Sequence, residues 1–301
     1  MRFAIFGAGA LGGCLGARLA ADGNEVVFVA RGAQREALSA QGLKLLAPDG
    51  DLHVHPVELY EDPATAGLFD FVLCCVRDSQ TDACIELVPP LLAADSAVLV
   101  LQSGMGAFWR FEQLVGRARL MGAYAELNAE QVAPGVVRQV SERAGLVVGE
   151  LDGVGSWRLD CLEAACESAG IGVRVSSDMN MEMWRHFMSR CALEVSAALN
   201  RCTVAEIGVR TEARCLFEIL FAEGFAVAAA HGIKLAGEIE PYAVLSKSAG
   251  SASRLRADFD KGLAMEVETF AGDMVRLGKE KGVAVAAFEE GYGELLALVK
   301  G

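Results

Sequence analysis

The first half of the chain alternates short apolar runs with helical patterns. The runs are rich in β-formers and end on glycine or polar residues, which is typical of buried strands. Because strands that alternate with helices favour a parallel sheet, this half predicts an α/β, doubly wound architecture. The expected strands are 2–6, 25–29, 69–76, 97–101, 120–127 and 172–175, with a hairpin over 136–149 at a sheet edge and a helix over 157–168.

The pattern changes after Ser176, where strand-like runs give way to apolar positions at helical spacing. We expect helices over 178–199, 210–231, 237–248, 251–282 with a potential break, and 286–300. The length of 301 residues also suits two domains. The sequence therefore predicts a mainly parallel α/β domain over 1–176 and an all-helical domain over 177–301, which we assign to substrate binding and dimerisation.

A glycine-rich turn follows the first expected strand. Residues 7–12 read Gly-Ala-Gly-Ala-Leu-Gly, a GxGxxG pattern between a strand and a helix, with a second strand close behind. In this setting Gly7 permits the tight turn, Gly9 lets a pyrophosphate approach the backbone, and Gly12 lets helix and strand pack closely. The motif predicts a Rossmann domain whose dinucleotide contacts include Gly7, Gly9, Ala10, Leu11 and Gly12. A purely structural glycine turn is the alternative.

The end of the second expected strand indicates which dinucleotide is preferred. An NAD site needs an acidic residue there to bind the ribose 2′-OH, whereas this chain reads VARGAQR over residues 29–35. The planar guanidinium of Arg31 can bind a 2′-phosphate bidentately. We therefore expect NADP(H) as cofactor, and the alternative is that Arg31 and Arg35 are solvated surface charges.

Composition limits the classes of partner. Hydrophobic residues make up 53% of the chain, enough for two cores, yet no apolar run reaches the ~20 residues of a membrane span. A formal net charge of -13 argues against nucleic acid and anionic membrane surfaces. The nine cysteines form no CxxC pair, which favours reduced thiols in a cytoplasmic protein. His53 and His55 lack a third ligand nearby, so we expect no metal site.

Several further segments occur in an order typical of one family. They are QSGMG at 102–106, PGVV at 134–137, EMWR at 182–185, EVETFAG at 266–272 and KGV at 281–283. Together with residues 7–12, these segments make essentially the whole chain resemble the ketopantoate reductase family. The resemblance implies a Rossmann domain followed by a helical domain, with an active site in the cleft between them. It also implies reduction of 2-dehydropantoate to pantoate by NADPH, on the path to pantothenate and coenzyme A.

The resemblance assigns site residues, several of which depart from the family pattern. The family's general-acid lysine is replaced by His186, its second lysine by Arg77, and its asparagine before GMG by Ser103. Two family asparagines align with Arg190 and Glu194, and a family serine aligns with Arg254. The implied catalytic residues are His186 and Glu266. The further cofactor contacts are Arg77, Ser103, Asn128 and Glu266, and the substrate contacts are Arg190, Glu194, Arg254 and Asp258.

Three polar residues on the first C-terminal helix are spaced four apart. His186, Arg190 and Glu194 therefore share one face. Because unpaired charges are costly to bury, this row either lines a cleft or forms an Arg190–Glu194 salt bridge beside a core histidine. In a cleft, the His186 imidazolium would protonate the product alkoxide, and a carboxylate such as Glu194 or Glu266 would raise the pKa of His186.

An arginine would bind the carboxylate of the substrate. Arg190, Arg254 and Arg77 are the candidates, and for the last two the alternative is a surface ion pair with Asp258 or Asp78.

Three functions remain open. The leading hypothesis is an NADPH-dependent reductase of a small anionic 2-oxo acid, with 2-dehydropantoate as the default substrate and a homodimer as a potential assembly. The second keeps hydride transfer but takes a bulkier or more acidic oxo acid, because His186 replaces the lysine and arginines are added. The third is a non-catalytic NADPH-binding protein, supported by the missing lysine alone. NADPH oxidation with a panel of 2-oxo acids separates them.

Overall fold

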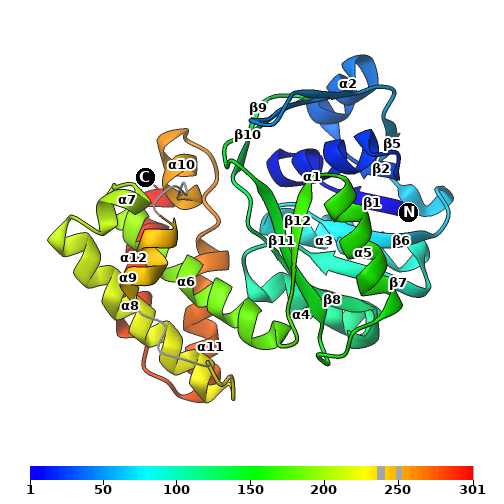
Figure 1. Ribbon diagram of the computed structural model, residues 1–301. Coiled ribbons are helices and arrows are strands. Elements are labelled where there is room, and N and C mark those ends of the chain that lie inside the picture. The colour runs from blue at the N-terminus through cyan, green and yellow to red at the C-terminus, as the bar shows by residue number, and fades with distance from the viewer. Residues whose placement is uncertain (236–240, 249–252, 301) are drawn as a thin grey trace. The chain divides into compact units, whose positions relative to one another are not determined.

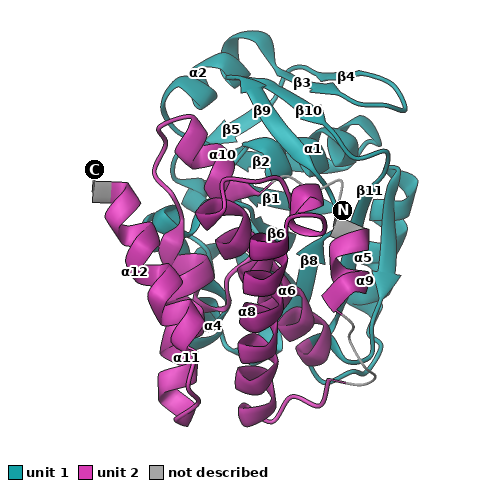
Figure 2. Cartoon of the chain, turned by 90° about the vertical axis from the view of Figure 1, so that its left-hand side faces the viewer, with its two compact units in different colours: residues 1–102, 107–179 teal, residues 103–106, 180–301 magenta. Residues whose placement is uncertain are grey.

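The computed structural model describes residues 1–235, 241–248 and 253–300, and the chain divides into two compact units (Figure 2). The first unit holds residues 1–102 and 107–179, and the second holds residues 103–106 and 180–301. The chain passes to the second unit at Met179, beside the boundary that we predict at 176/177. The assignment of residues 177–301 to substrate binding and dimerisation stays a prediction.

An eight-stranded sheet forms the centre of the first unit (Figure 1). Its neighbouring strands are parallel except for one antiparallel pair, β8 with β11. The central strands are buried almost throughout, which explains why they appear as continuous apolar runs. This confirms the predicted α/β class. The strand order is β12 (Ile171–Val175), β11 (Ala144–Glu150), β8 (Leu120–Ala125), β7 (Leu92–Val100), β6 (Phe69–Cys74), β1 (Arg2–Phe6), β2 (Glu25–Val29) and β5 (Glu58–Tyr60).

The order of the strands reverses at β1. The first crossover leads from β1 to β2 on one side, whereas β6 lies on the other side of β1. In open α/β sheets, ligands bind outside the carboxyl ends of the strands at such a reversal. The helices of this unit are α1 (Ala10–Ala21), α2 (Gly32–Gln41), α3 (Thr81–Ile85), α4 (Met105–Val115, which begins within residues 103–106 of the second unit) and α5 (Trp157–Ser168).

A second, four-stranded sheet packs on α1. Its order is β4 (Leu52–Val54), β3 (Leu43–Leu46), β10 (Val136–Gln139) and β9 (Ala129–Ala133). The predicted hairpin over 136–149 is wrong, because β10 pairs with β3 and β9 whereas β11 joins β8 and β12 in the large sheet. Two apolar runs separated by a polar turn look the same whether the strands pair with each other or part into different sheets.

The second unit is built of helices. They are α6 (Met179–Leu199), α7 (Val204–Ile207), α8 (Thr211–Ala230), α9 (Pro241–Ser248), α10 (Arg254–Asp260), α11 (Asp273–Lys281) and α12 (Ala286–Lys300). No strand occurs after residue 176 in the part of the chain that is described. The predicted helix over 251–282 is broken by a loop after α10 and a π-helical turn, Glu268–Gly272. Residues 237–240 and 251–252 of the predicted helices lie outside the described residues. Among the described helices, none is long and apolar enough to cross a membrane.

All nine cysteines are free thiols. Burial raises the pKa of Cys14 and Cys84 to about 11 and that of Cys166 to about 12. We expect a thiol reagent at neutral pH to label the exposed Cys215 quickly and these buried thiols only after denaturation, because the thiolate is the reactive form. Mass spectrometry of the labelled protein checks this. Rapid native labelling of Cys14 or Cys166 would contradict it.

Candidate active site

The glycine-rich turn joins β1 to α1 at the carboxyl edge of the large sheet. Gly7 has a φ of 91°, which side chains rarely allow. A Cβ on Gly12 would lie 2.1 Å from the Gly7 carbonyl oxygen, so helix and strand can approach this closely only at a glycine. Gly9 precedes α1 and offers no side chain to cap it, which leaves the first N–H groups of the helix, including those of Ala10 and Leu11, for an anion. The turn therefore fits a dinucleotide pyrophosphate.

Arg31 lies two residues after the end of β2 and directly precedes α2, with an exposed side chain. Its Nη2 atom donates to the carbonyl oxygen of Ala83 at 3.4 Å. Arg35, one turn further on, instead forms an exposed ion pair with Glu61 at 3.7 Å. No ion pair within the described part of the chain includes Arg31. Its charge is therefore available to a phosphate group at this edge of the sheet.

Two of the other predicted cofactor residues follow neighbouring strands of the large sheet. Arg77 follows β6, and its backbone N–H donates to Gln80 Oε1 at 3.3 Å. Asn128 follows β8, and its backbone N–H donates to Ser141 Oγ at 3.2 Å. Because parallel strands end at one edge, Arg77 and Asn128 lie at the same edge as the glycine turn. Ser103 and Glu266, the remaining two, belong to the second unit.

Asp78 is the partner that the sequence offers for Arg77 if Arg77 forms a surface ion pair. Its carboxylate forms an ion pair with Arg110 on α4 at 2.6 Å. Gln102 also ties the loops of this edge together, because its Nε2 atom donates to Val76 O and to Thr81 Oγ1, both at 2.8 Å.

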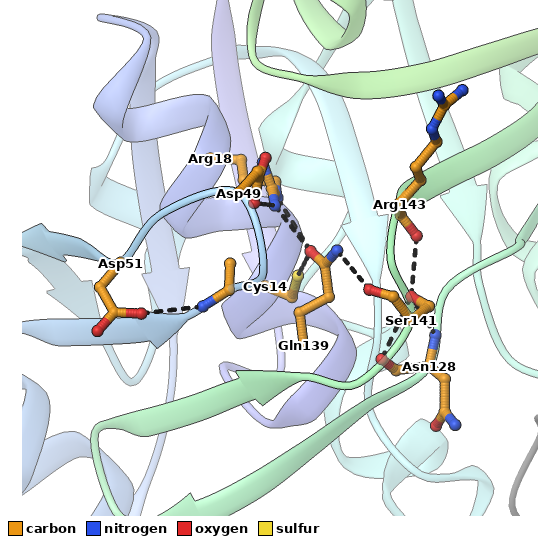
Figure 3. Close-up of polar contacts among 9 residues, drawn as sticks. Cys14, Arg18, Asp49, Asp51, Asn128, Gln139, Ser141 and Arg143 are labelled. Atoms are coloured by element: carbon orange, nitrogen blue, oxygen red, sulfur yellow. Dashed lines mark hydrogen bonds and ion pairs between the residues drawn. The ribbon is translucent and has the colours of Figure 1, made fainter.

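A polar network around the buried Arg18 and Gln139 connects α1 with the segment that holds Asn128 (Figure 3). Arg18 on α1 is 5% exposed and donates to both Asp49 oxygens, at 2.9 and 2.7 Å, and to Gln139 Oε1. The Arg18–Asp49 hydrogen bonds lower the pKa of Asp49. Gln139 Nε2 donates to the carbonyl oxygen of Ser141, whose hydroxyl bonds the Asn128 backbone. No local sequence pattern indicates this network, since its members are far apart in the chain.

Glu194 on α6 has no exposed surface. One carboxylate oxygen accepts a hydrogen bond from Arg190, and the other accepts from Ser253 Oγ at 2.8 Å and from the Leu255 N–H at 3.0 Å. The carboxylate therefore holds the first turn of α10. This corrects our assignment of Glu194 as a substrate contact, because a carboxylate with these partners and no accessible surface is an internal structural group. The alternative of an Arg190–Glu194 salt bridge is confirmed.

His186 lies one turn before Arg190 on α6 and keeps part of its surface exposed. Close packing by protein atoms is nevertheless the main cause that lowers its pKa to about 3, with the Arg190 guanidinium adding to the shift and the Glu182 carboxylate opposing it. The expectation that Glu194 or Glu266 raises this pKa is therefore wrong, since Glu182 is the only carboxylate with an upward effect and burial and Arg190 together outweigh it. The imidazole is neutral at neutral pH.

The remaining predicted residues of the second unit lie on α10 and in the loop after it. Arg254 is 44% exposed in its side chain, and its Nη1 atom lies 3.3 Å from Oε2 of the buried Glu266. Its ion pair is therefore with Glu266 rather than with Asp258, the partner considered from the sequence. Asp258 is buried on α10. Glu266 immediately precedes the helical turn that opens with Val267.

Two segments singled out in the sequence contact each other within the second unit. A Cβ on Gly104 would lie 2.7 Å from Thr269 Cγ2, and the Gly106 N–H donates to Asp273 Oδ2 at 3.1 Å. Gly104 is thus required by the close approach of the π-helical turn, and Gly106 lies against Asp273 at the start of α11. Such turns occur frequently at functional sites. No group of three metal-ligating side chains occurs among the described residues.

Comparisons with known proteins agree with this arrangement. The model described as "Ketopantoate reductase PanE/ApbA" matches residues 3–153, and "Ketopantoate reductase PanE/ApbA C terminal" matches residues 178–298. The chain is 27% identical to a 2-dehydropantoate 2-reductase from Mesorhizobium japonicum, over 93% of this chain and 92% of the relative. It is also 27% identical to a PanE/ApbA family ketopantoate reductase from Ralstonia eutropha, whose crystal structure has a TM-score of 0.88 and covers 100% and 99% of the two chains.

A more distant structural neighbour has a different activity in its name. It is D-mandelate dehydrogenase, whose ternary structure contains NADH and anilino(oxo)acetate. The TM-score is 0.87 over 100% of this chain and 99% of that chain, and at 19% identity the likeness shows the fold alone. The two family models, in contrast, together span nearly the whole sequence. The chain therefore belongs to the ketopantoate reductase family and is a nicotinamide-dependent oxidoreductase.

Proposed function

We propose that this protein is an NADP(H)-dependent reductase of a small anionic 2-oxo acid, and that 2-dehydropantoate is the substrate. The single observation that carries the cofactor choice is Arg31, which is exposed at the end of β2 where an NAD site has an acidic residue. The substrate assignment is supported by the relatives that are named 2-dehydropantoate 2-reductase.

The residues of the first unit bind and orient the cofactor. The N–H groups after Gly9 hold the pyrophosphate, and Arg31 holds the 2′-phosphate. When bound, the reduced nicotinamide supplies a hydride to the keto carbon. Arg77 and Asn128 complete the cofactor contacts that we assign to this unit, while Ser103 and Glu266 are assigned from the second.

The residues of the second unit act on the oxo acid. Arg254 attracts the carboxylate, since its side chain is 44% exposed while it also pairs with Glu266 at 3.3 Å. Arg190 contributes positive charge but is held by the buried Glu194. His186, as a neutral imidazole, hydrogen-bonds the keto oxygen through its ring N–H and so stabilises the alkoxide that hydride transfer would form, and a proton from water then completes the alcohol.

A specific observation favours a second candidate, which is reduction of a different 2-oxo acid. Three positions that carry a lysine, an asparagine and a serine in the family carry His186, Arg190 and Arg254 here. The likeness to D-mandelate dehydrogenase supports the idea that this fold accepts other oxo acids. We expect NADPH oxidation to be fastest with 2-dehydropantoate in a panel that includes aromatic and dicarboxylic 2-oxo acids. A larger kcat/KM for another oxo acid would show that this acid, and not 2-dehydropantoate, is the substrate. No turnover with any acid of the panel would favour the hypothesis of a non-catalytic binding protein.

The cofactor choice is tested at Arg31. We expect NADPH to bind at least about tenfold more tightly than NADH, and Arg31→Ala to remove this preference, because the guanidinium meets a group that NADH lacks. Fluorescence titration with both nucleotides measures the two Kd values. Arg35→Ala is the matched control, since Arg35 lies one turn away and is paired with Glu61. Equal affinities in the unmodified protein would overturn the assignment to NADP(H).

A further inference from the structure

The second sheet borders the space above Gly9. Val137 on β10 packs on the first turn of α1, where a Cβ on Gly13 would lie 2.7 Å from Val137 Cγ2. The neighbouring strand β9 carries Gln131, whose Oε1 atom lies 3.7 Å from the position of a Cβ on Gly9. Apart from chain neighbours and the backbone of the helix itself, no other described atom lies within 4 Å of that position.

This space is the one that the missing side chain of Gly9 leaves for a pyrophosphate. An amide side chain at its border can donate to a phosphate oxygen without adding charge. Gln131 is exposed, so its amide can reach a bound molecule.

Gln34 holds this amide in place. Gln34 Oε1 accepts hydrogen bonds from Gln131 Nε2 at 2.8 Å and from the Gly135 N–H at 3.0 Å. Gln34 Nε2 donates to the carbonyl oxygen of Ala8, within the glycine turn, at 2.5 Å. A single side chain from α2 therefore connects the phosphate-binding turn with β9 and with the turn between β9 and β10.

We infer that Gln131 is a further contact of the dinucleotide pyrophosphate and that Gln34 is its positioning residue. The inference rests on the proposed dinucleotide binding. The Gln131 amide carries two N–H groups and Gln34 engages one of them. Oε1 of the held amide borders the space above Gly9, so a tilt of the amide that keeps one N–H on Gln34 Oε1 brings the second N–H toward a phosphate oxygen. Because the pyrophosphate is common to NADPH, NADH and ADP-ribose, Gln131 contributes to affinity for all three and not to the choice between them.

The test is a binding measurement that needs no catalysis. Kd values for NADPH, NADH and ADP-ribose are measured by isothermal titration calorimetry on Gln131→Ala and Gln131→Glu. We expect Gln131→Ala to weaken all three by about threefold to tenfold, the effect of one hydrogen bond. We expect Gln131→Glu to weaken all three by at least about tenfold, because a carboxylate repels the pyrophosphate. The factor is the same for each ligand.

Glu130→Gln is the matched control. Glu130 is adjacent on β9, points to the opposite face of the strand and pairs with Arg138 at 2.8 Å, so its replacement leaves the three Kd values unchanged. Unchanged ADP-ribose affinity in Gln131→Glu would overturn the inference, as would a factor that differs between NADPH and NADH. If the unmodified protein prefers NADH but Gln131→Glu binds ADP-ribose more weakly, the proposed cofactor choice is refuted. The role of Gln131 as a pyrophosphate contact is then supported. A protein that binds none of the three ligands refutes both.

Gln34 has its own readout as a positioning residue. We expect Gln34→Leu to weaken ADP-ribose binding, and to weaken it no further when combined with Gln131→Ala, because Gln34 acts through Gln131. Additive losses in the double variant would show that Gln34 acts separately through the Ala8 carbonyl.

Discussion

Replacing His186 with alanine is expected to lower kcat by about 100-fold or more and to leave the Kd of NADPH unchanged. The nucleotide-binding turn belongs to the first unit, whereas His186 lies on α6 of the second. Loss of a donor to the keto oxygen removes stabilisation that develops in the transition state, so the effect falls on kcat. Steady-state kinetics and fluorescence titration on the same preparation measure the two quantities.

The pH profile tests the protonation state of His186. With a pKa lowered to about 3, the imidazole stays neutral across the neutral range, and its N–H donor persists. We therefore expect kcat to show no loss that follows an imidazolium with a pKa near 6.5. Such a loss in the unmodified protein, absent from His186→Gln, would restore the imidazolium acid that the sequence alone suggested.

Two variants separate chemistry from packing. His186→Gln retains an N–H donor and is expected to keep more activity than His186→Ala. His231→Ala removes the other histidine of the second unit, which lies against Trp184 and the Leu277 carbonyl oxygen, and should leave kcat unchanged. A His186→Ala variant with a lower Tm but normal kcat per folded molecule would show that His186 is a packing residue.

The same pKa shift affects stability. The unfolded chain binds a proton at His186 near pH 6.5, whereas the folded chain resists protonation until about pH 3. Folding is therefore increasingly disfavoured as the pH falls from about 6.5 toward 3. The free energy of unfolding of His186→Gln, measured in urea, should therefore fall less over this pH interval than that of the unmodified protein.

The sequence predicts the fold where the pattern is local. The run 2–6, the glycine turn and the run 25–29 form β1, α1 and β2 because periodicity and glycine placement act within 30 residues. The second sheet cannot be predicted in this way, since β4 is only three residues long and β9 is largely exposed, so neither strand has a clear apolar pattern. Its pairing of β10 with β3 depends on contacts across about 90 residues, which no local pattern encodes.

The candidate site shows the same division. Gly9 and Arg31 follow from motif and position, but the contact between Gln131 and Gln34 joins residues 97 apart in the chain. The row on α6 was predicted correctly as one helix face. The function of these residues could not be predicted in the same way, because it depends on what packs against the helix. Glu194, for example, accepts a hydrogen bond from Ser253, 59 residues away. Burial by these distant elements decides whether a polar residue is a ligand or a structural group.

Replacing Glu194 with glutamine is expected to lower the free energy of unfolding by about 3 kcal/mol. The carboxylate accepts from three donors, on Arg190, Ser253 and the Leu255 backbone, and the amide that replaces it brings donors of its own. The Arg190 charge would remain partly buried without its partner. Urea denaturation, with the slope compared between variants, measures the change.

The control is an exposed pair of the same spacing. Arg214 and Glu218 on α8 lie four residues apart at 3.7 Å with both side chains about half exposed, so Glu218→Gln should cost less than about 1 kcal/mol. Combining Glu194→Leu with Arg190→Met should recover much of the loss, because no unpaired charge remains buried. A Glu194→Gln variant that is as stable as Glu218→Gln but has a raised KM would instead show that Glu194 contacts the substrate. Loss of stability with an unchanged KM would identify Glu194 as the residue that anchors α10. Glu194 would then also fix the position of Arg254, which lies on that helix.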